Sequence, residues 1–414
     1  MSNVVSVAVA GGGASGLIAA ISAARAAKNE KRKADVFVFE GKPRVGKKIL
    51  VTGNGRCNLT NRNMSSEFYA GDIALFEAVY PQFNNEALIA FFEELGMPVR
   101  TDSAGRVYPM SNQASSVLDA LRYEAERLGV VFHTDTKILS VKRKNSGFLL
   151  NDVFFADKLI LACGGKAGPV HGSDGSGYDL LKNMGIGYSP VFPALTALEI
   201  NSFTKSLKGI RAQGSISVKV GGKVLKRAEG ELQYTEYGIS GIPAMQVSGA
   251  ASELVFLHKS ENVIITVDSA PSMSAEQLKA FLLAEIRQNG ERPCEMLLSG
   301  IMPKKLGAYI LSGLSINPSK NMASIHSTVI DKIVSAVKNK KYTLGGVRGF
   351  NDAQVTAGGV ASDELYPDTL ASKKIEGLYI CGELADIDGD CGGYNLQWAF
   401  SSGFVAGKNA VREK

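Results

Sequence analysis

The chain has 414 residues, of which 45% are hydrophobic and 21% charged, so it is long enough for more than one globular domain. Its net charge of +6 is modest for this length, its Lys and Arg residues are spread out, and the charge does not by itself favour nucleic-acid binding. No apolar run approaches the ~20 residues that span a bilayer, and no basic segment or cleavage site marks a secretion signal, so we expect a cytoplasmic protein away from membranes.

The five cysteines also argue for a reducing compartment. They are odd in number and form no CxxC pair. This pattern predicts free thiols and disfavours both a disulfide framework and a zinc site.

The first forty residues predict a strand, a helix and a second strand in close succession. Segment 4–10 is apolar and β-branched, 17–28 is alanine-rich and suits a helix, and 35–40 is again a short apolar run. Such a unit is the usual frame for a bound dinucleotide.

A GxGxxG motif stands between the first strand and the helix. Gly11 would allow the tight turn, Gly13 would let a pyrophosphate approach the backbone, and Gly16 would let the helix pack on the strand. The free N–H groups of the helix N-terminus, from Ala14 and Ser15 onward, would bind the phosphates.

An acidic residue ends the second strand at the position where a ribose is usually bound. Glu40 lies 24 residues after Gly16, close to the ~20 expected, and its carboxylate could accept hydrogen bonds from ribose hydroxyls. An acid here disfavours a 2′-phosphate, so FAD or NAD fits better than NADP.

The loop after this strand favours FAD, because a glycine- and arginine-rich segment can run beside the ribityl chain toward the isoalloxazine. It spans Arg44–Lys48 and TGNGRCN at 52–58. The cofactor contacts expected here are Gly41, Lys47, Gly53, Asn54, Gly55, Arg56, Cys57 and Asn58.

Two later segments add to the same prediction. An apolar strand at 159–162 ends in small residues that can turn over a cofactor, and the strand near 378 is followed by a helix whose N-terminus could stabilise negative charge on a reduced flavin. The expected contacts are Cys163, Gly164, Gly165, Gly382, Glu383, Asp388, Gly393, Tyr394, Asn395, Leu396 and Gln397.

Taken together, GGGASG, Glu40, GKKILVTGNGRCN and GELADIDGDCGGYNLQWAFSSG resemble the three-domain bacterial flavoprotein family that includes aminoacetone oxidase and BaiN-type flavoproteins. The resemblance covers nearly the whole chain. It implies non-covalent FAD, a backbone contact to adenine near Ile138, an Arg-Cys-Asn loop near the flavin, and an inserted β-barrel with a small helical domain.

The expected fold is therefore α/β, with a Rossmann-like FAD domain built from residues 1–189 and 341–414. Short strands with turn residues predict an antiparallel barrel over 190–272, and helical periodicity over 273–340 predicts a helical insert. A capping box at Ser274–Gln277 marks the start of one of these helices.

Four residues are candidates for direct chemistry. Arg56 and Asn58 offer polar contacts to flavin or substrate, His171 stands in a glycine-rich loop and could transfer a proton, and Tyr237 could line a substrate pocket together with Tyr234. No partner thiol or histidine stands close to Cys57 in sequence, so we interpret it as a packing residue.

Asp386, Asp388 and Asp390 alternate in a way that invites a calcium interpretation. The spacing lacks the glycine and the distal glutamate of a calcium loop, so we expect no metal and favour Asp388 as a contact to the ribityl chain.

The predicted function is an FAD-dependent oxidoreductase that moves a hydride between flavin N5 and a small organic substrate. Two directions remain open: oxidation of an amine or aminoketone, and reduction of an activated alkene with NAD(P)H as a transient reductant. Nucleic acid is an unlikely partner, and a flavoprotein that acts on or binds RNA is the alternative.

Overall fold

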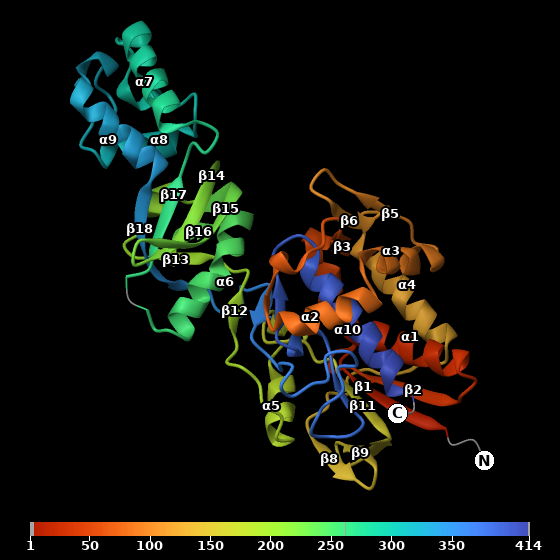
Figure 1. The fold of residues 1–414 in the computed structure, drawn as a ribbon. Helices are drawn as coiled ribbons and strands as arrows, with labels where there is room; N and C mark the ends of the chain where they lie inside the picture. Colours follow the sequence, from red (N-terminus) through yellow and green to blue (C-terminus); the bar gives the residue numbers. More distant parts are fainter. Residues whose placement is uncertain (1–3, 261, 413–414) are drawn as a thin grey trace. The chain divides into compact units, whose positions relative to one another are not determined.

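The computed structural model describes residues 4–260 and 262–412, and this part of the chain divides into two compact units (Figure 1). The first unit is built from two segments of the chain, one up to Pro193 and one from Ala353 onward. The second unit comprises Ala194–Asp352. Each unit has a hydrophobic core of its own. The α/β class and the barrel predicted from the sequence are both confirmed.

A five-stranded parallel sheet organises the first unit, with the strand order β20-β11-β1-β2-β7. Its central strands are almost completely buried, as the uninterrupted apolar runs predicted. The strands are β1 (Val5–Ala10), β2 (Ala34–Phe39), β7 (Val131–His133), β11 (Lys158–Leu161) and β20 (Leu378–Ile380).

Helices α1 and α10 pack against each other at very short range beside this sheet (Figure 1). A Cβ atom added to Gly403 would lie 2.3 Å from the carbonyl oxygen of Ser15, and one added to Gly407 would lie 2.1 Å from that of Ala19. The two helix backbones can approach this closely only because α10 carries glycine at both positions.

Helix α1 comprises Ala14–Asn29 and helix α10 comprises Tyr394–Ala410. The other described α-helices of the first unit are α2 (Ile73–Val79), α3 (Asn85–Glu94), α4 (Ala114–Arg127) and α5 (Ser176–Asn183).

Small antiparallel ladders complete this unit. They are formed by β3 (Thr60–Asn61), β6 (Arg106–Pro109) and β5 (Val99–Thr101); by β8 (Val141–Lys144), β9 (Gly147–Leu150) and β10 (Phe154–Ala156); and by β4 (Tyr69–Gly71) with β21 (Ile387–Gly389). A further pair joins β12 (Phe192–Ala194) to β19 (Val355–Ala357).

In its described residues the second unit contains a closed six-stranded antiparallel barrel and four α-helices. The barrel strands, in order around it, are β13 (Leu198–Ile200), β16 (Gly238–Ser240), β15 (Lys223–Tyr234), β14 (Arg211–Val220), β17 (Ile264–Asp268) and β18 (Lys340–Val347). The helices are α6 (Ile242–Phe256), α7 (Ala275–Asn289), α8 (Lys304–Ser312) and α9 (Ser327–Lys338), and α7 begins at the predicted capping box.

Strand β18 differs from the sequence-based division of the chain. It follows the helices α7–α9, pairs with β17 and β13, and closes the barrel, so the second unit continues to Asp352. The sequence had assigned 341–414 to the FAD domain. The lysines and glycines of KKYTLGGV hide the alternation that would have marked a barrel strand.

Within the described ranges, no helix combines the length and the apolar character that crossing a membrane requires.

The close contact between α1 and α10 predicts a strong effect of one added methyl group. Gly407→Ala should lower the free energy of unfolding of the first unit by about 1–3 kcal/mol, because the new Cβ meets backbone that cannot move aside. Urea unfolding followed by the fluorescence of Trp398, the single tryptophan of the chain, reports on this unit.

Gly249→Ala in α6 is the matched control, since a Cβ there meets nothing within 4 Å. Far-UV circular dichroism should show unchanged or slightly higher stability, by about 0.5–1 kcal/mol, because alanine favours a helix over glycine. Equal effects of the two substitutions would contradict the proposed packing constraint.

Candidate functional site

The glycine-rich turn leaves the N-terminus of α1 open. A Cβ at Gly11, whose φ is +107°, would lie 2.3 Å from the carbonyl oxygen of Ala162, and a Cβ at Gly16 would lie 1.8 Å from that of Gly11. By contrast, a Cβ at Gly13 would meet nothing within 4 Å, and no side chain of the described protein caps the helix there. The turn is thus packed on one side and open at the helix end that favours phosphate.

Glu40 is held at the edge of this turn by two backbone donors. Its carboxylate accepts hydrogen bonds from the N–H of Gly12 at 3.0 Å and from the N–H of Lys42 at 2.8 Å. The N–H of Glu40 also donates to the carbonyl of His133, and the carbonyl of Glu40 accepts from the N–H of Thr136. Ile138, whose side chain is buried, follows Thr136 by two residues. The carboxylate is therefore oriented by the fold rather than by a flexible side chain.

A network of side chains joins three remote segments of the first unit. Glu383 accepts hydrogen bonds from the N–H of Thr356 at 2.7 Å and from the Lys48 ammonium at 2.9 Å. Lys48 also donates to the carbonyl of Ala167 at 3.1 Å, and the Thr356 hydroxyl accepts from the N–H of Lys166 at 2.7 Å. The sequence pointed to Glu383 as a contact but indicated no role for Thr356 or for Lys48, although Lys48 stands within the GKKILVTGNGRCN segment.

The loop after β11 lies within this arrangement. Gly165 leaves no room for a side chain, because its Cβ would lie 2.8 Å from Glu383 Oε1. Half-buried His171 ends the short turn Pro169–His171, and its ring lies near Gly168, which is also close to the Lys48 side chain. The structure thus brings Gly165 and His171 close to the residues around Lys48, whereas the half-buried Cys163 donates to the carbonyl of Ala10 at 3.4 Å and Gly164 lies against Ser173.

The TGNGRCN loop forms two tight turns around a buried cysteine. Gly53, Asn54 and Cys57 all have φ between +55° and +57°, and the N–H of Cys57 donates to the carbonyl of Thr52 at 3.0 Å. Burial raises the pKa of the Cys57 thiol to about 12, although a hydrogen bond with Thr52 lowers it in part. The thiol is therefore protonated at neutral pH and packs in the core, and contact of Cys57 with a cofactor stays a prediction.

Asn58 connects this loop to the N-terminus of α10. Its side-chain oxygen is buried and accepts no hydrogen bond from the described residues. A Cβ at Gly393, the residue before α10, would lie 2.9 Å from this oxygen and 2.4 Å from the carbonyl oxygen of Thr60. An amide oxygen that is buried without a donor indicates a place where a bound group could donate one.

Other predicted contacts in α10 serve the fold in this structure. Gln397 is completely buried; its amide accepts from the Thr60 hydroxyl at 2.6 Å and donates to Ser401 at 2.8 Å and to the carbonyl of Phe83 at 3.1 Å. Asn395 exchanges two hydrogen bonds with Gly389. Tyr394 stacks on Phe68, and Leu396, between Asn395 and Gln397, is half-buried. Contact of Tyr394, Asn395, Leu396 and Gln397 with a cofactor stays a prediction.

The three alternating aspartates do not gather around one point. Asp386 accepts a hydrogen bond from the Ser189 hydroxyl at 2.9 Å, and burial, together with nearby Asp72, raises its pKa. Asp388 lies in β21 opposite Ala70. Throughout residues 4–260 and 262–412, no group of three histidine, cysteine or acidic side chains has an arrangement that could hold a metal ion.

Tyr234 and Tyr237 belong to the second unit. Tyr234 is buried in the barrel core, and the guanidinium of Arg348 lies 4.9 Å from the ring centre of half-buried Tyr237. A role of Tyr237 toward substrate stays a prediction.

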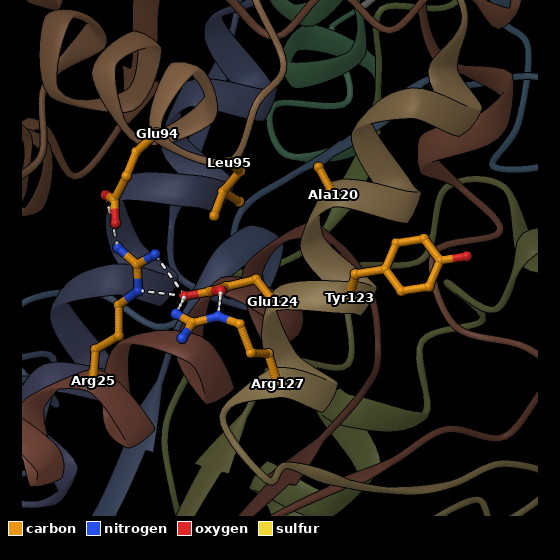
Figure 2. Close-up of a pocket in the computed structure, with 7 residues that line it drawn as sticks. All are labelled: Arg25, Glu94, Leu95, Ala120, Tyr123, Glu124 and Arg127. Carbon is orange, nitrogen blue, oxygen red and sulfur yellow. Dashed lines mark hydrogen bonds and ion pairs between the residues drawn. The ribbon is translucent and has the colours of Figure 1, made fainter.

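A separate cavity of about 390 Å³ lies among α1, α3 and α4, where Figure 2 shows the Glu124 carboxylate between two guanidinium groups. Arg25 and Arg127 donate to it at distances of 2.6–2.9 Å. Burial raises the pKa of Glu124, but the hydrogen bonds from Arg127 and Arg25 outweigh it and hold the pKa below its usual range. Arg25 also pairs with the Glu94 carboxylate at 3.1 Å, so two guanidinium groups face two carboxylates and the cavity is lined by a charge-balanced, structural ion-pair network.

The buried, protonated thiol predicts a mild effect of Cys57→Ser. The variant should retain FAD at one per chain and most of its activity, because nothing in the chemistry requires a thiolate. Absorbance of the purified protein at the flavin band measures the FAD content, and the turnover rate measures the activity. Loss of turnover with FAD still bound would show that the sulfur takes part in the reaction.

Gly55→Val should instead weaken FAD binding about tenfold or more. Gly55 has φ of +80°, and a Cβ there would touch only the Leu50 carbonyl oxygen at 3.9 Å, so the effect comes from backbone strain in the loop. Gly96→Val is the matched control, with φ of +76° and open space, outside the site. Equal loss of FAD from the two variants would contradict a role of the loop in binding.

Comparisons with known proteins identify the family to which the chain belongs. The family model described as "HI0933-like protein Rossmann domain" matches residues 5–409. A 3-dehydro-bile acid delta(4,6)-reductase of Clostridium scindens is 40% identical over 409 residues, which cover 97% of this chain and 98% of the relative. A ribosomal RNA dihydrouridine synthase of Haemophilus influenzae is 27% identical over 424 residues, with 98% of each chain covered.

Solved structures match this chain only at low identity and with low TM-scores. Adenylylsulfate reductase from Archaeoglobus fulgidus is 14% identical with a TM-score of 0.41, covering 99% of this chain and 70% of that one. The tetrameric form of 2-methyl-3-hydroxypyridine-5-carboxylic acid oxygenase is 13% identical with a TM-score of 0.35, covering 97% and 80%. The family match over residues 5–409 and the 40% identity confirm the predicted resemblance: the chain belongs to the HI0933-like family of FAD-dependent, Rossmann-type oxidoreductases.

Proposed function

We propose that this protein is an NAD(P)H-driven reductase of carbon–carbon double bonds conjugated to a carbonyl group. The observation that carries the proposal is the relationship over nearly the full length, at 40% identity, to a protein named as a 3-dehydro-bile acid delta(4,6)-reductase. Of the two directions that the sequence left open, this relationship favours reduction over the oxidation of an amine or aminoketone.

Three features of the first unit fit FAD as the resident cofactor. The N-terminus of α1 is open at Gly13 and can receive a pyrophosphate. The Glu40 carboxylate is fixed by two backbone N–H groups and keeps acceptor capacity for ribose hydroxyls. The buried side-chain oxygen of Asn58 has no hydrogen-bond donor among the described residues, so it could accept a hydrogen bond from a bound flavin.

When bound, FAD supplies the transfer of two electrons between a reduced nicotinamide and the double bond of the substrate. The residues of the chain itself orient the cofactor and stabilise its charge. Glu40 and α1 hold the nucleotide end, and the N-terminus of α10, which no described side chain caps, presents its positive dipole end beside Asn58. His171 is the candidate to move a proton to the substrate.

We also propose that the protein acts in the cytoplasm. All five of its cysteines are in the reduced form in the structure. Reduced cysteines support a reducing compartment.

The reductase proposal predicts anaerobic reduction of the bound flavin by a nicotinamide. Purified yellow protein mixed with NADH or NADPH should lose its absorbance near about 450 nm, and a 3-oxo-4-ene steroid acid should then restore it, because the double bond takes the electrons. A saturated steroid acid is the control and should leave the flavin reduced. A flavin that neither nucleotide bleaches would rule out this function.

A second candidate, reduction of uridine in RNA, rests on the distribution of charge. Residues 194–352 contain 19 Lys and Arg against 13 Asp and Glu, whereas the rest of the chain contains 27 of each. The entire net charge of +6 therefore belongs to the second unit, which suits a polyanionic partner. Dihydrouridine is uridine reduced at a double bond conjugated to a carbonyl, and two relatives that are 27% and 26% identical are named as ribosomal RNA dihydrouridine synthases.

RNA as the substrate predicts salt-dependent binding and a product in RNA. The holoprotein should bind ribosomal RNA fragments with an affinity that falls steeply as salt rises, and RNA incubated with protein and NADPH should gain dihydrouridine. Steroid turnover without detectable RNA binding at low salt would favour the first candidate.

A further inference from the structure

Two arginines of the first unit lie over the same tyrosine ring. The guanidinium carbon of Arg56 is 5.3 Å from the ring centre of Tyr108, and that of Arg100 is 5.1 Å from it. The antiparallel register places Arg100 on β5 directly opposite Tyr108 on β6, and Arg56 follows the glycine turns of the TGNGRCN loop. Because the Tyr108 side chain is buried, its ring is held in position and can make cation–π contacts with both arginines.

Neither of these arginines is neutralised by an acid. Four arginines occur between residues 56 and 106. Arg62 and Arg106 pair with carboxylates at 2.8 and 2.9 Å, whereas Arg56 and Arg100 form no ion pair with any residue that the structure describes. Both guanidinium groups lie within 5.3 Å of one ring centre and neither is paired with a described carboxylate, so a bound anion that contacts them would relieve their mutual repulsion.

Their hydrogen-bond partners are neutral and leave donors available. The Nε of Arg56 donates to the carbonyl of Gly53 at 3.3 Å, and its side chain is exposed. Among the described residues, the guanidinium of Arg100 donates only to the side-chain oxygen of Asn112, which lies 2.8 Å from the Arg100 Nε. Both guanidinium groups are therefore held in place by these hydrogen bonds, and each keeps N–H groups that can donate to a further acceptor.

The pair also lies beside the predicted flavin site. Asn58, two residues after Arg56, lies against Gly393 at the N-terminus of α10. We propose that Arg56 and Arg100, held by Tyr108, form a subsite for the anionic group, a carboxylate or a phosphate, of a molecule that reacts at the flavin. This inference rests on the proposed reductase function and deepens it, because it requires an anionic substrate or reductant.

Two sources could bring this anion to the site. One is the acid group of the organic substrate, and the other is a phosphate of NAD(P)H. Planar guanidinium groups bind either chemistry with paired hydrogen bonds, so binding measurements have to separate them.

The test compares Arg56→Gln, Arg100→Gln and Arg143→Gln in the oxidised holoprotein. Arg143 is the matched control, since it also lies over an aromatic ring, 4.9 Å from the centre of Phe148, and is exposed. Equilibrium binding is measured for four probes: a 3-oxo-4-ene steroid acid, its methyl ester, NADH and NADPH. Binding to oxidised protein requires no turnover, so its outcome is independent of whether the flavin is reduced by either nucleotide.

Removing one charged donor should weaken binding of the anionic probe by about 10- to 100-fold. If the substrate supplies the anion, the steroid acid loses affinity while the ester and the nucleotides are unaffected. If the reductant supplies it, the nucleotides lose affinity and the steroids do not. Arg143→Gln should change neither, and Arg56→Lys should restore part of the affinity because it keeps the charge.

Three results would overturn the subsite. They are unchanged binding of all probes in both variants, equal losses for the acid and its ester, and loss of FAD, which would assign the arginines to the cofactor. Because Arg56 is exposed and Arg100 is tied to Asn112, Arg56→Gln remains informative if Arg100→Gln fails to fold.

Discussion

The position of helix α1 is the constraint on which the first unit depends. The helix is fixed on one side by the turn through Gly11 and Gly16, and on another by the backbone of α10 at Gly403 and Gly407. At each of these positions a single Cβ atom would collide with a carbonyl oxygen. The N-terminus of α1 is consequently set by main-chain contacts, which leave little freedom for the place where a phosphate would bind.

The rest of the site is tied to that helix by hydrogen bonds between distant segments. Glu40 reaches back to Gly12, Glu383 joins Lys48 to Thr356, and Thr60 bonds Gln397 across 337 residues of sequence. Several of these groups are shielded from water, where a hydrogen bond holds its geometry well. The predicted cofactor contacts thus fall into two kinds: those with open acceptors or space, such as Gly13 and Asn58, and those already engaged by the protein.

Sequence reasoning recovered the elements whose residues have local physical causes. The buried strand before Gly11, the helix after it, the acid at the end of β2 and the capping box of α7 each follow from a few adjacent residues. What it missed depends on tertiary pairing. Lys48 has meaning only because Glu383 lies beside it, and β18 joins the barrel through partners far from it in sequence. A lysine in a loop and a strand rich in lysine and glycine carry no local signal of either role.

The late position of β18 has a consequence for biosynthesis. The barrel closes only when residues 340–347 pair with β13 and β17, and the parallel sheet receives its edge strand β20 only at residues 378–380. Helix α10, which covers α1, is the last helix of the chain. Neither unit can therefore be completed while the C-terminal quarter is still inside the ribosome. Until then β11, β13 and β17 have unpaired edges, and the nascent chain must be kept from pairing with others.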